Sequence, residues 1–256
     1  MSIVLGFILA LFSAPLWAAS GPSNPGAILQ YWNNSRNQPA AAGGGSDLVI
    51  LNNNNGTKRT AGATTLSWNT SAVPTSGNMI VVGVSATQAL GVSAVTDNCS
   101  TSFTRDIVVG AGQQAAIFHG VVGSCGNPYT ITVTPDASAA MDASSFEVSN
   151  QNATPGDVGQ SGTGTGTAPA TGNTATTSAT TQLAFAVFAG DGANPTSITM
   201  PTGWTQLYSE GDGSVYEIGA GAYSLSNSTL SSVAIGATFS MNNSMNWVAA
   251  IFTFKK

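Results

Sequence analysis

The stretch Tyr129-Thr130-Ile131-Thr132-Val133-Thr134 indicates the fold class of this chain more clearly than any other. Apolar residues alternate with threonines along it, and successive side chains of an extended strand point to opposite faces. Tyr129, Ile131 and Val133 therefore share one face, and the threonines share the other. This period of two predicts a β-strand with one apolar and one polar face.

Short apolar or alternating runs continue on both sides of this stretch, separated by polar turns rich in Gly and Asn. No segment after residue 46 repeats its apolar residues at the helical period. Many short strands joined by such turns predict an all-β chain, folded as an antiparallel β-sandwich or jelly roll. The expected strands are Leu48–Asn52, Thr65–Asn69, Met79–Ser85, Val92–Asp97, Phe103–Val109, Ala115–Val122, Tyr129–Thr134, Ser144–Val148, Gln182–Phe188, Ser197–Met200, Thr205–Ser209, Val215–Ile218, Gly221–Ser226, Val233–Phe239 and Trp247–Phe254.

The expected strands of the domain at 47–256 form two sets that resemble each other, at about 47–155 and 175–256. Ile131 precedes Ile235 by 104 residues, and other pairs repeat this interval with small drifts. The pattern favours one sandwich built from two related halves over two separate sandwiches, because small domains bury less of their surface. Chance matching in a chain of biased composition is the alternative explanation.

The run from Ser161 to Ala170, which consists mainly of Gly and Thr, lies between the two sets. Chains rich in small, flexible residues behave as flexible linkers. We therefore expect this run to cross the surface between the two halves without regular structure.

We expect residues 1–20 to be a hydrophobic leader or anchor. Residues 21–46, with their Gly-Pro and Asn-Pro-Gly turn signals, are expected to be a linker. As a helix, Ile3–Trp17 would rise about 22 Å, which is short of the bilayer core of about 30 Å, so no stable membrane span is expected. Leu16–Ser20 resembles the cleavage region of a secretory signal peptide, although no Lys or Arg precedes the apolar run. The alternative is a retained N-terminus that docks into a larger assembly.

Charged residues make up 7% of the 256 residues, and the chain has 1 histidine and 2 cysteines. Most enzymatic chemistry needs clustered titratable groups or metal ligands, so this composition predicts a structural or binding protein rather than an enzyme. His119 lies in an apolar run, and no Gly-x-Ser-x-Gly motif occurs, so we expect it to be structural. The carboxylates are scattered, and a glycosidase pair such as Asp106 and Glu217 is not expected.

The formal net charge is −5, and only Lys58-Arg59 and Lys255-Lys256 are adjacent basic residues. Binding to the phosphate backbone of DNA or RNA requires clustered basic residues, so no nucleic-acid partner is expected. No cofactor is expected either. The acidic turns Asp97-Asn98 and Glu210–Gly213 offer oxygen ligands for Ca²⁺, but they lack the spacing of an EF-hand, and turn chemistry explains their composition.

Cys99 precedes the expected strand Phe103–Val109, and Cys125 follows the expected strand Ala115–Val122. If the two strands form a hairpin through Gly110–Gly112, both cysteines lie at its open end. The Cα atoms of a disulfide are about 5.5 Å apart, which this arrangement allows. We therefore predict a Cys99–Cys125 disulfide, which implies an oxidising or extracellular location. Two unrelated loop thiols are the alternative.

Aromatic residues gather in the second set of strands. Trp204 follows the turn Pro201–Gly203, and with Tyr208 it is the best candidate for a platform on which a sugar ring stacks. Filling of the sandwich core is the alternative role for these residues. The wider set of candidates is Trp204, Tyr208, Tyr216, Tyr223 and Trp247.

Several short motifs follow one another along the chain: Met79–Val84, Val95–Asn98, Ser102–Arg105, Tyr129–Val133, Ser145–Val148, Pro201–Thr205 and Trp247–Phe252. Their order resembles a β-sandwich module of bacterial secreted or surface proteins and of phage tail and virion proteins. The resemblance covers roughly residues 47–254, and its motifs are structural. It implies display, adhesion or assembly, and it brings no catalytic residues.

These observations predict a non-enzymatic structural or display protein on the exterior of an assembly. The leading hypothesis is a phage virion decoration or fibre component on the virion exterior, with other structural subunits or further copies of itself as partners. The alternative is a secreted bacterial protein at the cell surface that mediates adhesion or binds a surface glycan.

Overall fold

The structure is a computed structural model that describes residues 46–52, 58–89, 91–191, 197–211, 218–226 and 228–256. The chain divides into two compact units, Met1–Asn37 and Gln38–Lys256, and every described residue belongs to the second unit. The leader or anchor expected at 1–20 and the linker expected at 21–46, Ser46 excepted, lie outside the described residues.

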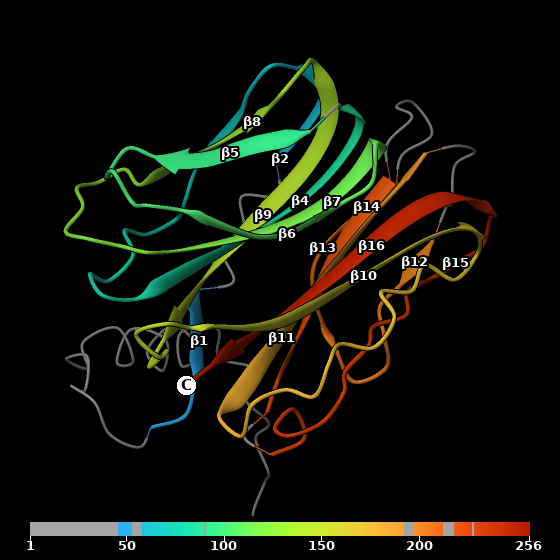
Figure 1. The fold of residues 1–256 in the computed structure, drawn as a ribbon. Coiled ribbons are helices and arrows are strands. Elements are labelled where there is room, and N and C mark those ends of the chain that lie inside the picture. Colours follow the sequence, from blue (N-terminus) through green and yellow to red (C-terminus); the bar gives the residue numbers. More distant parts are fainter. Residues whose placement is uncertain (1–45, 53–57, 90, 192–196, 212–217, 227) are drawn as a thin grey trace, which may run out of the picture. The chain divides into compact units, whose positions relative to one another are not determined.

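The described residues form an all-β fold with 16 strands and no helix, which confirms the predicted fold class (Figure 1). All strand pairs are antiparallel. The strands are β1 (Val49–Asn52), β2 (Lys58–Ala63), β3 (Leu66–Asn69), β4 (Met79–Ala89), β5 (Val92–Asp97), β6 (Thr104–Val109), β7 (Gly112–Val121), β8 (Thr130–Pro135), β9 (Ala139–Ser149), β10 (Gly156–Gly166), β11 (Thr181–Asp191), β12 (Ile198–Thr199), β13 (Thr205–Gly211), β14 (Ile218–Leu225), β15 (Ser240–Met241) and β16 (Met245–Lys255).

Two large sheets form the centre of this fold. The first main sheet has the order β1-β9-β4-β7-β6, with β2 also pairing with β9. The second main sheet has the order β10-β16-β11-β14-β13. The outer sheet, β3-β8-β5, packs on the first main sheet, and the short pair β12-β15 belongs to the layer that covers the second.

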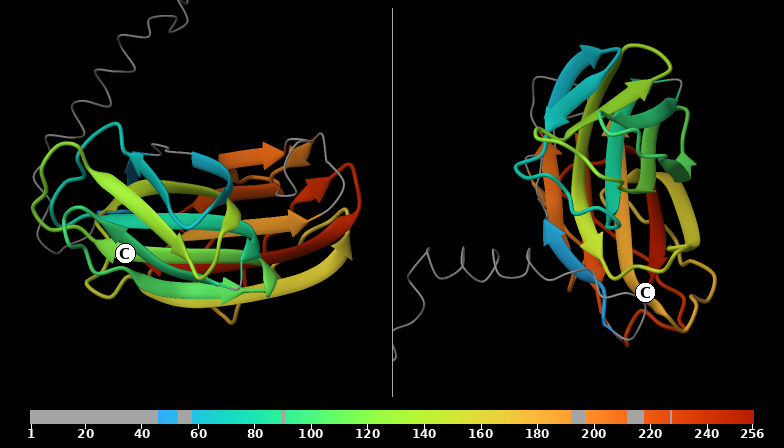
Figure 2. Two further views of the ribbon diagram at one scale, coloured as in Figure 1. Left: turned by 90° about the horizontal axis from the view of Figure 1, so that it is seen from above. Right: turned by 90° about the vertical axis from the view of Figure 1, so that its left-hand side faces the viewer.

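Three apolar clusters join these layers. One lies between the outer sheet and the first main sheet, one lies between the two main sheets, and one covers the far side of the second main sheet. Figure 2 shows the main sheets face to face. Both faces of their central strands are buried, so β9 and β11 have nearly continuous buried runs instead of the alternation of β8.

The two main sheets are built in the same way. In the first, strands β9-β4-β7-β6 are neighbours, and in the second, β16-β11-β14-β13 are neighbours in the corresponding order. β1 and β2 precede the first group of four strands in the chain, and β10 precedes the second group. Each of them pairs with the last strand of its group, which is β9 in the first sheet and β16 in the second. The correspondence concerns topology, and a duplication of sequence stays a prediction.

The expectation of a flexible crossing at Ser161–Ala170 is wrong for Ser161–Gly166, which belongs to β10 and pairs with β16. Glycine is needed there for close approach rather than for flexibility. A Cβ atom on Gly164 would lie 2.6 Å from the Trp247 ring, and one on Gly162 would lie 2.2 Å from the carbonyl oxygen of Ala170. Glycine thus lets the indole and the returning chain pack directly on the strand.

The expectation of a regular strand at Val233–Phe239 is also wrong. This segment pairs with residues 169–177 through backbone hydrogen bonds such as Thr174 N to Ile235 O, at 2.8 Å. Threonine hydroxyls replace part of the ladder: Thr171, Thr174 and Thr177 accept from the N–H groups of residues 237, 235 and 233. We call these three buried side chains the threonine ladder.

Candidate interaction surface

His119 and Asp106 form a half-buried pair between the two main sheets. The Nδ1 atom of His119 lies 2.7 Å from a carboxylate oxygen of Asp106, and the Phe254 ring packs edge-on against the imidazole at 5.7 Å. Burial raises the pKa of Asp106, and the hydrogen bond and charge of His119 oppose that shift only in part. No Ser, Thr or Cys side chain hydrogen-bonds to His119 among the contacts of the described residues.

The Asp106 carboxylate orients the imidazole of His119, and the structural role of this histidine stays a prediction. Glu217, which was considered with Asp106 as a glycosidase pair that is not expected, lies outside the described residues. In the described part of the chain, no group of three or more His, Cys, Asp or Glu side chains is arranged to hold a metal ion.

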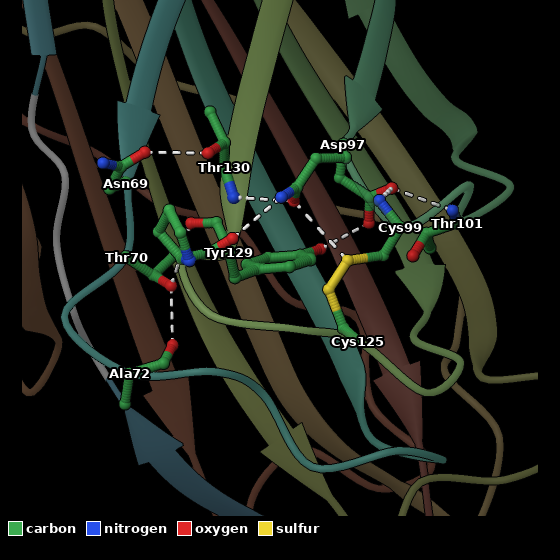
Figure 3. Close-up of a disulfide and its surroundings, with 11 residues drawn as sticks. Asn69, Thr70, Ala72, Asp97, Cys99, Thr101, Cys125, Tyr129 and Thr130 are labelled. Atoms are coloured by element: carbon green, nitrogen blue, oxygen red, sulfur yellow. Dashed lines mark hydrogen bonds between the residues drawn. A yellow bond between two sulfur atoms is a disulfide. The ribbon is translucent and has the colours of Figure 1, made fainter.

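The predicted disulfide between Cys99 and Cys125 is present, with its Cα atoms 5.4 Å apart. β6 and β7 pair as the expected hairpin, with Thr104 opposite His119 and Val109 opposite Ala115. The two cysteines lie at the open end of this hairpin, where their side chains pack against the cluster beneath the outer sheet (Figure 3).

Asp97 and Tyr129 link this disulfide to the outer sheet. Asp97 accepts hydrogen bonds from the backbone N–H groups of Cys99 and Thr101, both at 2.9 Å, and from the Tyr129 hydroxyl at 2.8 Å. Burial by itself would raise the pKa of Asp97, but the hydrogen bonds from Thr101, Tyr129 and Cys99 outweigh it and lower the pKa. Burial, together with the hydrogen bond and charge of Asp97, raises the pKa of Tyr129.

The same contacts bear on Ca²⁺ binding at Asp97-Asn98. Both carboxylate oxygens of Asp97 accept hydrogen bonds from donors of the protein. Asn98 accepts from the N–H of Thr130 and donates to the carbonyl of Pro128. The bonds from Cys99 and Thr101 to one Asp97 oxygen are the turn chemistry considered from the sequence. The other Asp97 oxygen and the Asn98 oxygen accept from Tyr129 and Thr130 of the neighbouring strand segment. Residues 212 and 213 of the other acidic turn lie outside the described residues.

The outward side of the outer sheet is a polar surface with a regular pattern. Ser67 of β3 and Thr96 of β5 both lie opposite Thr132 of β8, so their side chains share one side of the sheet. Ser67 and Thr132 are joined by a hydroxyl–hydroxyl hydrogen bond of 2.8 Å. We call this surface the hydroxyl face; it consists of Ser67, Asn69, Thr96, Thr130, Thr132 and Thr134.

None of the six residues of the hydroxyl face is charged, and each is exposed or half-buried. Thr130 donates to the side-chain oxygen of Asn69 at 2.8 Å, which orders two further groups on the face (Figure 3). The face therefore offers hydroxyl and amide groups, held in register by the β-ladder, to a neutral polar partner. The alternation at 129–134 predicts its central strand, whereas the contributions of Ser67, Asn69 and Thr96 need the strand pairing.

Trp204 and Tyr208, the predicted stacking pair, do not lie on one surface. Trp204 is half-buried and packs on the cluster that covers the far side of the second main sheet. Tyr208 is 2% exposed, packs in the cluster between the main sheets, and shares a hydrogen bond of 2.7 Å with Ser85. β13 has a bulge between Gln206 and Tyr208, and the side chains of Trp204 and Tyr208 lie on opposite sides of the sheet. Tyr208 thus has the core role considered as the alternative.

The remaining aromatic candidates do not complete a platform among the described residues. Tyr223 packs on Phe146 between the main sheets, with ring centroids 5.6 Å apart. Trp247 lies over Gly164 on the far side of the second main sheet. Tyr216 lies outside the described residues.

A small hollow beside Glu147 is lined by Thr70, Ile80 and Phe146 among others, and it has room for about one water molecule. Glu147 already accepts hydrogen bonds there from the N–H of Thr75 and the side chain of Asn78. Among the described residues, no helix is long and apolar enough to cross a bilayer.

Comparison of the chain with protein-family models, with curated proteins and with solved structures finds no match.

Proposed function

We propose that this chain is a non-enzymatic structural protein displayed on the exterior of an assembly, with a virion decoration or fibre component as its leading form. The observation that supports this proposal best is the hydroxyl face. A neutral, regular polar surface is suited to contact with a polar partner, and it lacks the ionisable groups that most catalysis requires.

Two ionisable groups, Asp97 at the end of β5 and Asp106 between the main sheets, are engaged within the fold. Asp97 is held by Tyr129 and by the turn that carries Cys99, and Asp106 is held by His119. The Cys99–Cys125 bond ties the outer sheet's turn to the β6–β7 hairpin. Disulfides persist in oxidising surroundings, which supports an exterior location.

Fractionation of the native protein tests the proposal. Particles purified from the producing culture should contain the chain, and an antibody raised against its folded domain should label their surface in electron microscopy. The intact mass should be that of the full-length chain, and reduction should add the mass of two hydrogens. A chain found only in the soluble secreted fraction, shortened by its leader, would contradict the virion form and favour secretion.

The second candidate function is carbohydrate binding by a secreted surface protein, and the hydroxyl face is the observation that favours it. Hydroxyl and amide groups exchange hydrogen bonds with sugar hydroxyls. We expect binding on a glycan array to fall about tenfold in Thr96→Val/Thr132→Val, whereas Thr202→Val, at an exposed turn residue, should bind normally.

The aromatic alternative makes a different prediction in the same experiment. If the half-buried Trp204 ring holds the sugar, binding should be lost in Trp204→Ala and retained in Thr96→Val/Thr132→Val. Absence of binding by the wild-type protein to every glycan would contradict the carbohydrate function and leave the display function untouched.

A further inference from the structure

The edge strands of the two main sheets differ in length and in charge. β1, β2, β6 and β13 have 4, 6, 6 and 7 residues, and β10 has 11. Of the short edge strands, β2, β6 and β13 include charged residues, such as Arg105 and Asp106 in β6, and β1 does not. β10 has no Lys, Arg or Pro, and its one charged residue, Asp157, stands near its start.

Asp157 does not protect the outer edge of β10. Its carboxylate accepts hydrogen bonds from the N–H of Ser178 and from the hydroxyl of Thr181. The uncharged part of the strand, Gly159–Gly166, then pairs with β16 at eight consecutive positions. Natural proteins usually protect long edges with lysines, prolines, bulges or covering segments, and this part of β10 has none of the first three.

The other side of Gly159–Gly166 has no backbone partner among the described residues. The chain that follows packs on a face of the sheet instead, where Ala170 approaches Gly162. In an antiparallel ladder, alternate residues direct both backbone groups away from the neighbouring strand. Half of the residues of Gly159–Gly166 therefore present an N–H and a carbonyl to the outside.

We propose that this edge pairs with the same edge of a second copy of the chain. Two β10 strands related by a two-fold axis run antiparallel, which is the geometry of every strand pair in the fold. The contact would join two five-stranded sheets into one continuous sheet.

The side chains of β10 are compatible with antiparallel pairing to β10 of a second copy. Ser161, Thr163 and Thr165 share one face, because each lies opposite a β16 residue of the same parity. In an antiparallel self-pair, hydroxyl side chains then lie opposite hydroxyl side chains, and Thr–Thr pairs across strands are favourable. On the other face, the returning chain at Ala170 and the Trp247 ring pack on Gly162 and Gly164.

Light scattering and sedimentation of the full chain test this proposal. The wild-type protein should have twice the mass of one chain. Thr163→Lys/Thr165→Lys and Thr163→Glu/Thr165→Glu should each raise the dimer dissociation constant about tenfold or more, since like charges then lie opposite one another. An equal mixture of the two variants should recover the dimer, which a misfolded variant would not do.

Thr202→Lys/Gln206→Lys is the matched control, because it adds the same charge at exposed positions on and before β13, the opposite edge of the second main sheet. It should dimerise as the wild type does. A monomeric wild type, or an oligomer whose mass is unchanged in the Thr163→Lys/Thr165→Lys variant, would overturn the proposal; the latter result would place the contact elsewhere, including on residues 1–45. The test is independent of the proposed function, since the hydroxyl face belongs to a different sheet.

Discussion

The layers that cover the two main sheets satisfy their backbone hydrogen bonds in different ways. Over the first main sheet, β3, β8 and β5 form a regular ladder, closed at one end by a disulfide. Over the second, residues 169–177 and 233–239 run side by side with a single isolated β-bridge, and the buried threonine ladder supplies the missing acceptors. A covering layer thus needs satisfied backbone groups more than it needs regular strands.

The largest difference should come from the disulfide, which only the first covering layer has. Cys99→Ser/Cys125→Ser should lower the free energy of unfolding by about 3 kcal/mol, because the bond closes a loop between residues 26 positions apart. Urea denaturation of the variant and the wild type measures the change. An unchanged midpoint would show that the β6–β7 hairpin and Asp97 hold the outer sheet without the bond.

The threonine ladder should be the corresponding weak point of the second layer. Thr174→Val keeps the shape of the side chain but leaves the N–H of Ile235 without its hydroxyl acceptor, at a cost of about 2 kcal/mol. Thermal unfolding of the variant checks this value. Thr174→Ser, which retains the hydroxyl, should recover most of the loss, and equal losses in both variants would mean that the methyl group matters more.

The Asp97–Tyr129 contact should contribute less and should depend on pH. Tyr129→Phe removes one hydrogen bond to a carboxylate and should cost about 1.5 kcal/mol at neutral pH. The pKa of Asp97 in the folded protein is below its usual value of 3.8, so its contribution is complete above that pH. It is lost as the pH falls below 3.8 through the lower folded value.

The unfolding free energy of Tyr129→Phe should therefore fall less steeply in acid than that of the wild type. Denaturation at several pH values between neutrality and acid measures both slopes. Parallel curves would mean that Thr101 and Cys99 hold the Asp97 carboxylate without help from the tyrosine hydroxyl.

The smallest effect should come from the hydroxyl face. Thr132→Val removes a hydroxyl from the half-buried polar side of β8, and the change in unfolding free energy should stay within about 0.5 kcal/mol. The contrast with Thr174→Val sharpens the comparison, because both change Thr to Val and only one leaves a buried N–H without its acceptor. A large loss in Thr132→Val would mean that the face has a structural role.

Sequence patterns predicted the outer sheet well. β8 has a strict alternation, β5 was predicted with its observed bounds, and the cysteine positions around one hairpin predicted the disulfide. These features depend on neighbours along the chain. The strand β10 was not predicted, because its glycines indicated a flexible linker. Their role depends on contacts with Trp247, which is far away in the sequence, and with Ala170, which lies on the returning segment.

By itself, the sequence determined that the domain is all-β and that Cys99 and Cys125 meet, since both follow from local periodicity and hairpin geometry. Only the tertiary structure decided which face of each strand is buried when both are apolar, as in β9 and β11. It also placed Trp204 and Tyr208 on opposite sides of one sheet and gathered the hydroxyl face from three strands. The physical reason is that strand pairing and sheet packing join residues far apart in the chain, which no local pattern specifies.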